Sequence, residues 1–271
     1  MSIAAAYLVS EGIVLGGDSS TTVQIQGGGV AQLLTHSQKV FEVGSNSRLG
    51  ICTWGAGSFS TVSHRTIVAQ LADKIGDATT VEFAVNELIK IVEPKFSDSG
   101  VEFVGYYLGG CDPTTHAPSC YRVEFQKEKA PKIAPLQLGS AEFSGTSNFF
   151  TRVFFGFDPQ LPKSLKDELK KSLGTLGTID NFDAMFDAAF ENAYTPLTLR
   201  GFQDLPIREA IDFIYSYMHI TIKAEKFKFG APSCGGPIEL GFITTDRCFR
   251  WVRHKPFHSA IIEQEGEYDV K

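Results

Sequence analysis

The sequence predicts an α+β fold, a four-layer α/β/β/α sandwich in which two mostly antiparallel sheets pack together with helices on their outer faces. Strand-like segments come first, then two helices, more strands, several helices and a closing hairpin, which is not the alternation of a parallel βαβ fold. A tight turn joins the first two strand-like segments, as it joins antiparallel neighbours. Because no repeat or linker divides the 271 residues, we expect one domain over residues 1–271, with a polar tail from about residue 255.

The strand-like segments of the first part are rich in small and apolar residues. Segments 3–10 and 12–18 read IAAAYLVS and GIVLGGD, and a turn at Ser10, Glu11 and Gly12 joins them. Neither segment has a polar face, so we expect both strands to be buried. Three successive glycines at 27–29 form a loop before two further strand segments, 32–43 and 48–55.

The helices are expected in two groups. The first group covers residues 58–76 and 81–92, and the second of these segments carries apolar residues at helical spacing: Phe83, Val85, Leu88, Ile89 and Val92. Strands return at 101–110, 119–126 and 131–138. The second group of helices covers 148–157, 164–173, 181–194 and 208–227, and a hairpin of 237–245 with 248–254 closes the fold.

The composition narrows the class of protein. A net charge of −6 and a hydrophobic fraction of 43% indicate neither disorder nor a nucleic-acid partner. No apolar run approaches the ~20 residues of a membrane span, and the first residues lack the pattern of a signal peptide. We therefore expect a cytoplasmic protein with no membrane partner that keeps its first residues apart from Met1. The five cysteines lack Cys-x-x-Cys spacing, and most are expected to be reduced core residues: Cys52, Cys111, Cys120, Cys234 and Cys248.

The second residue is a candidate nucleophile. Methionine is normally removed when a small residue follows it, and loss of Met1 would leave Ser2 with a free α-amine. An α-amine has a pKa of about 7.7 to 8.0, so it can act as a base near neutral pH. A serine hydroxyl needs a neighbouring base to become a good nucleophile, and here both groups would belong to one residue. Since many chains begin with Met-Ser for no catalytic reason, the prediction needs further support.

Asp18 and Lys39 provide that support. The strand segment GIVLGG ends at Asp18, and its glycines allow backbones to approach closely there. Lys39 lies in the next strand segment beside apolar Val40 and Phe41, so an inward-pointing Lys39 needs an acidic partner. A pair of Asp18 and Lys39 would bring positive charge near Ser2 and favour loss of protons from its hydroxyl and amine. The alternative is a turn-capping aspartate and a surface lysine.

The stretch GICTWGAGSFST provides a candidate oxyanion site. A strand breaks at Gly55 and Gly57, and we expect a helix to begin near Ser58. Backbone N–H groups at a helix start can stabilise an oxyanion, and glycine lets a carbonyl group approach closely. Glycines that end a strand are more often a simple turn, so this signal is weak by itself.

Together these residues resemble the proteasome β-subunit family of N-terminal nucleophile (Ntn) hydrolases. With Met1 removed, Ser2 matches the family's N-terminal threonine, and GIVLGGDS matches its G-V-V-L-A-A-D-S segment, so that Asp18 matches the family's aspartate. Lys39 in QKVFEV resembles the family's lysine, after a longer loop. The stretch GAGSFS resembles the segment with the oxyanion glycine, which implies Gly57, with Gly55 as the other candidate.

Two later segments extend the resemblance. FSGTSNFF is similar to the family's serine-glycine-serine segment, which implies Ser144 as the supporting serine, with Ser140 as the other candidate. The segment SCGGPIELGFIT, which follows a late helix, is more similar in sequence to the bacterial proteasome-like proteins called Anbu than to the classical β-subunits. The chain departs from the family at two points, because Ser20 replaces an arginine and no carboxylate stands near Ala231. Ser233 and Cys234 are the nearest polar groups to that position.

The resemblance implies an N-terminal-serine amide hydrolase, a proteasome-like peptidase that acts on a peptide or protein substrate. In that reading the Ser2 hydroxyl attacks the carbonyl group, its amine relays the proton, and Lys39 held by Asp18 tunes both. The N–H group of Gly57 receives the oxyanion and Ser144 supports the amine. The resemblance also implies self-assembly into a ring or spiral homo-oligomer, and it leaves an unfoldase partner open. Two alternatives remain: a catalytically inactive structural subunit and a non-proteolytic Ntn amidohydrolase.

We expect neither a cofactor nor a metal. His254 and His258 have the i, i+4 spacing of helical metal ligands, but Pro256 between them disfavours a helix. Cys234 has no neighbouring histidine in the sequence that would favour a thiol nucleophile. The glycine loop at 27–29 lacks the Lys-Ser/Thr of a phosphate-binding loop.

Overall fold

The computed structural model describes most of the chain. The described ranges are 2–24, 30–146, 160–174, 181–194, 202–229 and 232–255, with a few further residues at 149, 152 and 156–158. Met1, the glycine loop at 27–29, most of the helix expected at 148–157, Ala231 and the tail from residue 256 lie outside the described residues.

One five-stranded sheet contains both ends of the described chain. Its strands follow the order β12-β1-β2-β13-β14, and every neighbouring pair is antiparallel. The bounds are β1 (Ile3–Val9), β2 (Gly12–Gly17), β12 (Ala141–Gly145), β13 (Glu239–Thr244) and β14 (Arg247–Arg253). The strand pair β1 and β2 therefore lies inside the sheet, with strands on both sides.

The second five-stranded sheet is also antiparallel, in the order β11-β10-β9-β6-β5. Its strands are β5 (Val40–Glu42), β6 (Leu49–Gly55), β9 (Phe103–Cys111), β10 (Pro118–Gln126) and β11 (Lys132–Pro135). Two small hairpins stand beside the sheets, β3 (Thr21–Gln24) with β4 (Val30–Leu34), and β7 (Ser58–Phe59) with β8 (Val62–Ser63).

The alternation of side chains in β1 explains why this strand is apolar throughout. Ala4, Ala6 and Leu8 belong to the core between the two sheets, whereas Ile3, Ala5 and Tyr7 belong to the core on the opposite face. Successive side chains of a strand point to opposite faces, so a strand covered on both faces needs apolar residues at every position.

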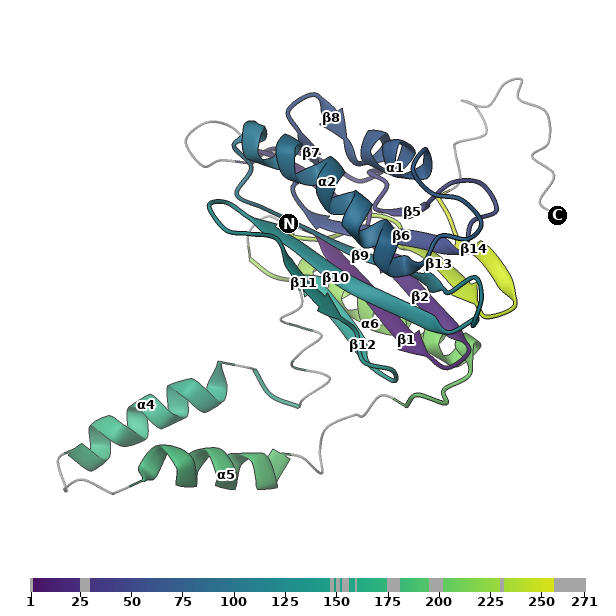
Figure 1. Cartoon of the computed structure of the whole chain (residues 1–271). Helices are drawn as coiled ribbons and strands as arrows, with labels where there is room; N and C mark the ends of the chain where they lie inside the picture. The colour runs from purple at the N-terminus through teal and green to yellow at the C-terminus, as the bar shows by residue number, and fades with distance from the viewer. Residues whose placement is uncertain are drawn as a thin grey trace.

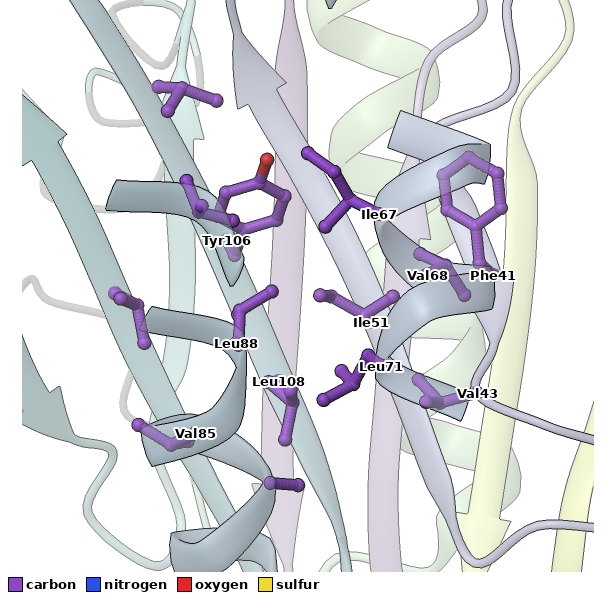
Figure 2. Close-up of a cluster of buried hydrophobic side chains, with 14 of the residues drawn as sticks. Phe41, Val43, Ile51, Ile67, Val68, Leu71, Val85, Leu88, Tyr106 and Leu108 are labelled. Carbon is purple, nitrogen blue, oxygen red and sulfur yellow. The ribbon is translucent and has the colours of Figure 1, made fainter. Parts of the chain in front are cut away.

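Helices α1 (His64–Ala72) and α2 (Val81–Ser99) cover the outer face of the second sheet. Figure 2 shows their core, in which Ile67 and Leu71 of α1 and Leu88 of α2 meet Ile51 of β6 and Leu108 of β9. Hydroxyl caps begin both helices, because the Ser63 side chain accepts the N–H of Thr66 and the Thr80 side chain accepts that of Phe83.

Helix α6 (Ile207–Lys226) covers the outer face of the first sheet, where Ile214 and Met218 pack against β1 and β2. Figure 1 shows α1 and α2 on one side of the strands and α6 on the other. Helices α4 (Leu161–Gly174) and α5 (Phe182–Tyr194) lie beside each other and away from the sheets (Figure 1). No helix among the described residues is long and apolar enough to cross a membrane.

The α+β prediction with two mostly antiparallel sheets is confirmed. The helix expected to begin near Ser58 is wrong, because the β7–β8 hairpin fills residues 58–63 and α1 begins only at His64. Phe59 of β7 is buried in the core under α2, and residues 58–63 consist only of Ser, Phe, Thr and Val, which have low helix propensity. Lys39 stands just before β5 rather than inside a strand, and residues 141–145 form a strand that the sequence did not predict.

Candidate active site

The register of β1 and β2 brings Ser2 and Asp18 to the same end of the first sheet. Ala4 pairs with Gly17, so the residue after β2 stands opposite the start of β1. Two hydrogen bonds fix this end: Ile3 N donates to Asp18 Oδ1 at 3.0 Å, and Asp18 N donates to Ile3 O at 3.1 Å. Antiparallel pairing therefore makes Ser2 and Asp18 neighbours although 16 positions separate them.

Asp18 is fully buried, and all its hydrogen-bond contacts are donors. Oδ1 accepts from Ile3 N and from Lys39 Nζ, the latter at 2.5 Å. Oδ2 accepts from Ser20 N at 3.2 Å, Ser20 Oγ at 2.5 Å and Gly235 N at 2.9 Å. Ser20, which replaces the arginine of the resembled family, therefore contributes two donors to the same carboxylate.

Lys39 points inward, and 7% of its side chain is exposed. Its backbone is held from two sides, because Lys39 N donates to Glu239 Oε2 at 3.2 Å and Thr53 N donates to Lys39 O at 3.0 Å. Lys39 is thus buried, as the sequence predicts, and its partner is Asp18. A buried ammonium group needs such a partner, since an unpaired charge in the core is strongly destabilising.

Ser2 and Lys39 line the same cavity, which has a volume of about 270 Å³. Its wall also contains both candidate oxyanion glycines, Gly55 and Gly57, and the aromatic side chains of Trp54 and His64. Most of the remaining lining residues carry hydroxyl or amide groups: Thr21, Thr22, Ser37, Gln38 and Thr53. The cavity is therefore polar, and Lys39 is its one charged lining residue among the part of the chain that the structure describes.

The strand β12 fixes Ser2 from the other side. Thr146 N donates to Ser2 O at 2.7 Å, and Ile3 pairs with Gly145. Gly145 has a φ of 85°, and a Cβ atom at this position would lie 1.9 Å from Ser2 O. Only glycine fits such a close approach in this conformation, which explains the glycine in FSGTS.

Ser144, the predicted supporting serine, lies next to this contact but its hydroxyl is engaged elsewhere. Ser144 pairs with Ala4 across β12 and β1, and its Oγ lies 2.6 Å from the hydroxyl of Tyr107. Burial raises the pKa of that tyrosine, and the hydrogen bond to Ser144 partly opposes the shift. The other candidate, Ser140, lies at the far end of β1, where Leu8 N donates to Ser140 O. The Oγ of Ser140 donates to Gln137 O.

Thr146 and Glu225 are polar residues near the site that the sequence analysis missed. The buried Thr146 Oγ1 has no hydrogen-bond partner among the described residues. Glu225, in the last turn of α6, accepts from Ser233 N at 3.1 Å and from Ser233 Oγ at 2.6 Å. One signal was present in the sequence, because Glu225 follows Met218 and Thr221 on the buried stripe of α6, where a carboxylate is unexpected.

The segment 232–236 joins Glu225 to Asp18. Burial by itself would raise the pKa of Glu225, but the hydrogen bonds from Ser233 and the charge of Lys228 lower it overall. Cys234, next to Ser233, is buried, and burial together with the charges of Asp18 and Glu225 raises the pKa of its thiol to about 12. Such a thiol stays protonated near neutral pH, so Cys234 is a poor nucleophile.

His64 lines the cavity, but its hydrogen bonds leave it no role as a base. Burial lowers the pKa of His64, which favours the neutral ring. Nε2 lies 2.7 Å from Ala56 O, which only accepts, so Nε2 carries the proton and Nδ1 accepts from the Tyr106 hydroxyl at 3.0 Å. Both ring nitrogens are therefore occupied by structural contacts.

Both oxyanion candidates remain beside the cavity. Gly55 ends β6 with a φ of 91°, and a Cβ atom on Gly57 would lie 3.2 Å from Thr21 Cγ2. Because α1 begins at His64, no helix start reinforces the N–H of Gly57. Within the described ranges, no three His, Cys, Asp or Glu side chains come together as a metal site would require.

Comparison with known proteins places the fold. No protein-family model matches the chain, and no curated protein does so with significance. Among solved structures, a helical assembly of the Anbu complex from Pseudomonas aeruginosa matches 96% of this chain and 90% of that chain, with a TM-score of 0.56 and 14% sequence identity. The two chains share a fold. At this identity, the match shows a shared fold and assigns neither a family nor an activity.

Proposed function

We propose that this protein is an N-terminal-serine amide hydrolase of the Ntn type, a proteasome-like peptidase, which uses Ser2 after removal of Met1. The observation that carries the proposal is the position of Ser2 on the wall of a polar cavity beside the buried Lys39–Asp18 ion pair. The likeness to an Anbu subunit supports it at the level of fold.

In the proposed reaction, Ser2 Oγ attacks the carbonyl carbon of the amide while the α-amine of Ser2 takes the hydroxyl proton. The N–H of Gly57, or of Gly55, donates to the oxygen that becomes negative. The C–N bond then breaks, and the amine returns the proton to the leaving nitrogen. A water molecule repeats the attack on the ester so formed, with the amine as base, and restores Ser2.

Lys39 and Asp18 act on this reaction through charge. The ammonium of Lys39 beside Ser2 stabilises negative charge on Oγ and disfavours a protonated α-amine. Asp18 holds the ammonium from Oδ1, and with Oδ2 it fixes Ser20 and Gly235 around it. Because the pair is buried and held by several hydrogen bonds, its field requires little reorganisation during the reaction.

We propose that residues near Ser2 hold its α-amine in place through hydrogen bonds. The hydroxyl of Ser144 is hydrogen-bonded to the hydroxyl of Tyr107, so we assign Ser144 an indirect effect on the α-amine. Thr146 lies directly opposite Ser2, and its hydroxyl has no partner in the part of the chain that the structure describes, which makes it the better candidate for a hydrogen bond to the amine. Glu225, which accepts from Ser233, is the candidate we assign for the carboxylate that the sequence lacks near Ala231.

The proposal includes self-assembly of a single domain into a ring or spiral, for which the helical Anbu assembly is the support. The hairpin of α4 and α5 is the surface we assign to it. No described side chain of these helices is buried, although Leu161, Leu165, Leu169 and Met185 are apolar and at least 42% exposed. Two helices without a buried core are marginal by themselves, so we infer that a second copy covers them.

All five cysteines are free thiols, which fits the reducing cytoplasm that we propose for this protein.

The test is the intact mass and the N-terminal sequence of the purified protein, before and after exposure to a hydroxyl-directed covalent inhibitor. We expect loss of Met1 and one adduct on Ser2. The matched control is Ser2→Ala, which keeps a small second residue and so keeps Met1 removal, but has no hydroxyl to label. A retained Met1 without an adduct would refute the proposed hydrolase activity and leave the alternative of a catalytically inactive structural subunit.

The second candidate is a non-proteolytic amidohydrolase on the same fold. The cavity favours it in one respect, because no feature of its polar wall among the described residues requires a long peptide. Hydrolysis of small amides, but of no peptide longer than a few residues, by the protein that labels at Ser2 would select this candidate.

A further inference from the structure

Glu239 is a fully buried carboxylate that the proposed mechanism does not use. It is the first residue of β13, in the stretch PIEL, and it pairs with Gly17 of β2. A Cβ atom on Gly17 would lie 3.1 Å from Lys39 Cβ, so this end of the β2–β13 pair lies against Lys39. A buried carboxylate at a strand position requires donors from elsewhere in the chain.

The donors come from two segments far apart in the sequence. Lys39 N donates to Glu239 Oε2 at 3.2 Å. His254 Nδ1 lies 3.0 Å and Lys255 Nζ 3.4 Å from the other oxygen, Oε1. Glu239 therefore joins the segment that contains Lys39 to the two residues that follow β14.

Lys255 also binds the Lys39 segment directly. Its ammonium donates to His36 O at 3.0 Å and to Ser37 O at 2.6 Å, and 10% of its side chain is exposed. Burial lowers the pKa of Lys255, while the charge of Glu239 opposes that shift. His254 is stacked on Trp251, with ring centroids 4.2 Å apart and planes 8° apart, which fixes the backbone that leads to Lys255.

The segment 35–39 depends on these contacts because it belongs to no strand. Its other backbone anchors are the bond from Ser37 N to Ser19 O and the bond from Thr53 N to Lys39 O. Ser37, Gln38 and Lys39 form one wall of the candidate active site. A shift of this segment would therefore change both the wall and the reach of the Lys39 ammonium toward Ser2.

We propose that Glu239 is a positioning residue for Lys39, and that His254 and Lys255 form a latch that holds segment 36–39 in place through Glu239 and the carbonyl groups of His36 and Ser37. The catalytic consequence rests on the proposed function, whereas the placement of the segment does not. Residues on the C-terminal side of the fold then control the active-site wall without touching Ser2.

The test compares Lys255→Met and Glu239→Gln with two controls. Lys255→Arg retains a cationic donor, and Arg250→Met changes an exposed residue of β14 that makes no latch contact. Hydrogen exchange measures the amides of 36–39, and a water-soluble acetylating ester with mass spectrometry measures the accessibility of Lys39. Labelling of Ser2 by the covalent inhibitor measures reactivity, and thermal unfolding identifies any variant that has lost the fold.

We expect Lys255→Met and Glu239→Gln to raise both exchange of the 36–39 amides and acetylation of Lys39, and to lower the rate of Ser2 labelling about tenfold or more. Lys255→Arg should recover most of each effect, and Arg250→Met should resemble the wild type. If Glu239→Gln does not fold, Lys255→Met decides.

Unchanged exchange and acetylation in folded Lys255→Met would overturn the latch. Raised exchange with protected Lys39 and unchanged Ser2 labelling would overturn the positioning role. A wild-type protein that does not label at Ser2 would refute the proposed function instead, and exchange and acetylation would still decide whether the latch positions Lys39.

Discussion

Asp18→Asn is the most informative single change, because it removes the charge that compensates Lys39 and preserves the shape of the side chain. Lys39 would remain as a buried ammonium beside a neutral amide. The new NH2 group would also face a donor, since both oxygens of Asp18 accept from N–H or O–H groups. Removing one partner of a buried ion pair costs about 3–5 kcal/mol, a large share of the roughly 5–15 kcal/mol that stabilise a typical domain.

Urea unfolding at fixed protein concentration measures this cost, and a double-mutant cycle with Lys39→Met identifies its origin. Lys39→Met alone leaves Asp18 with the donors of Ile3, Ser20 and Gly235, so we expect a smaller loss of about 1.5–3 kcal/mol. The double variant contains no unpaired charge, so its loss should fall short of the sum of the single losses by about 2 kcal/mol. Additivity within about 0.5 kcal/mol, or a loss below about 1 kcal/mol for Asp18→Asn, would refute the buried-pair argument.

Three further changes test other parts of the structure. Gly145→Ala would place a Cβ atom against Ser2 O at a residue with positive φ. We expect a loss of at least about 1–3 kcal/mol in the unfolding free energy measured in urea, together with loss of Ser2 labelling. A urea unfolding midpoint equal to that of the wild type would contradict the close approach. Burial lowers the pKa of His64, so the contribution of the neutral ring to stability is present above pH ~6.5 and decreases as the pH falls. On the acid side, His64→Gln should reduce the slope of the unfolding free energy against pH by up to about 1.4 kcal/mol per pH unit. An identical slope in the variant and the wild type would contradict this. Leu165→Glu with Leu169→Glu should give a smaller assembly by light scattering. Leu138→Glu changes a leucine outside the hairpin that is slightly more exposed, and it should leave the assembly unchanged; equal effects would argue against the hairpin as the interface.

The elements that the sequence predicted are those with a strong local pattern. The first two strands follow from apolar residues at every position and a short turn, and their antiparallel register alone places Asp18 beside the start of β1. The burial of Lys39 follows from its apolar neighbours, and a single carboxylate at the end of the preceding buried strand was the natural partner. Two adjacent strands and one charge requirement thus predict that Ser2, Asp18 and Lys39 lie close together, and their catalytic roles stay predictions.

The residues that the sequence did not predict depend on contacts between distant segments. Phe59 enters the core under α2, and residues 58–63 form a hairpin there. Their Ser, Phe, Thr and Val residues have low helix propensity, so the prediction extended the helix too far toward the N-terminus. Glu225 gains its place near the site from Ser233, and Thr146 from the pairing of β12 with β1. Neither pairing leaves a periodic signal in the chain, because each is decided by how the sheets and α6 pack together.

The two sides of the candidate site are held by different forces, and this difference predicts how variants will behave. Ser2 and Asp18 are fixed by backbone pairing in the middle of a five-stranded sheet, which opens only with most of the fold. The segment before Lys39 is fixed mainly by side chains from Glu239 and Lys255, which can be lost while the strand pairing remains. Changes at the first side should therefore reduce stability and reactivity together, whereas changes at the second should reduce reactivity with a smaller loss of stability. A plot of Ser2 labelling rate against unfolding free energy for both sets of variants should separate into two groups, and a single common line would show that the site is held as one unit.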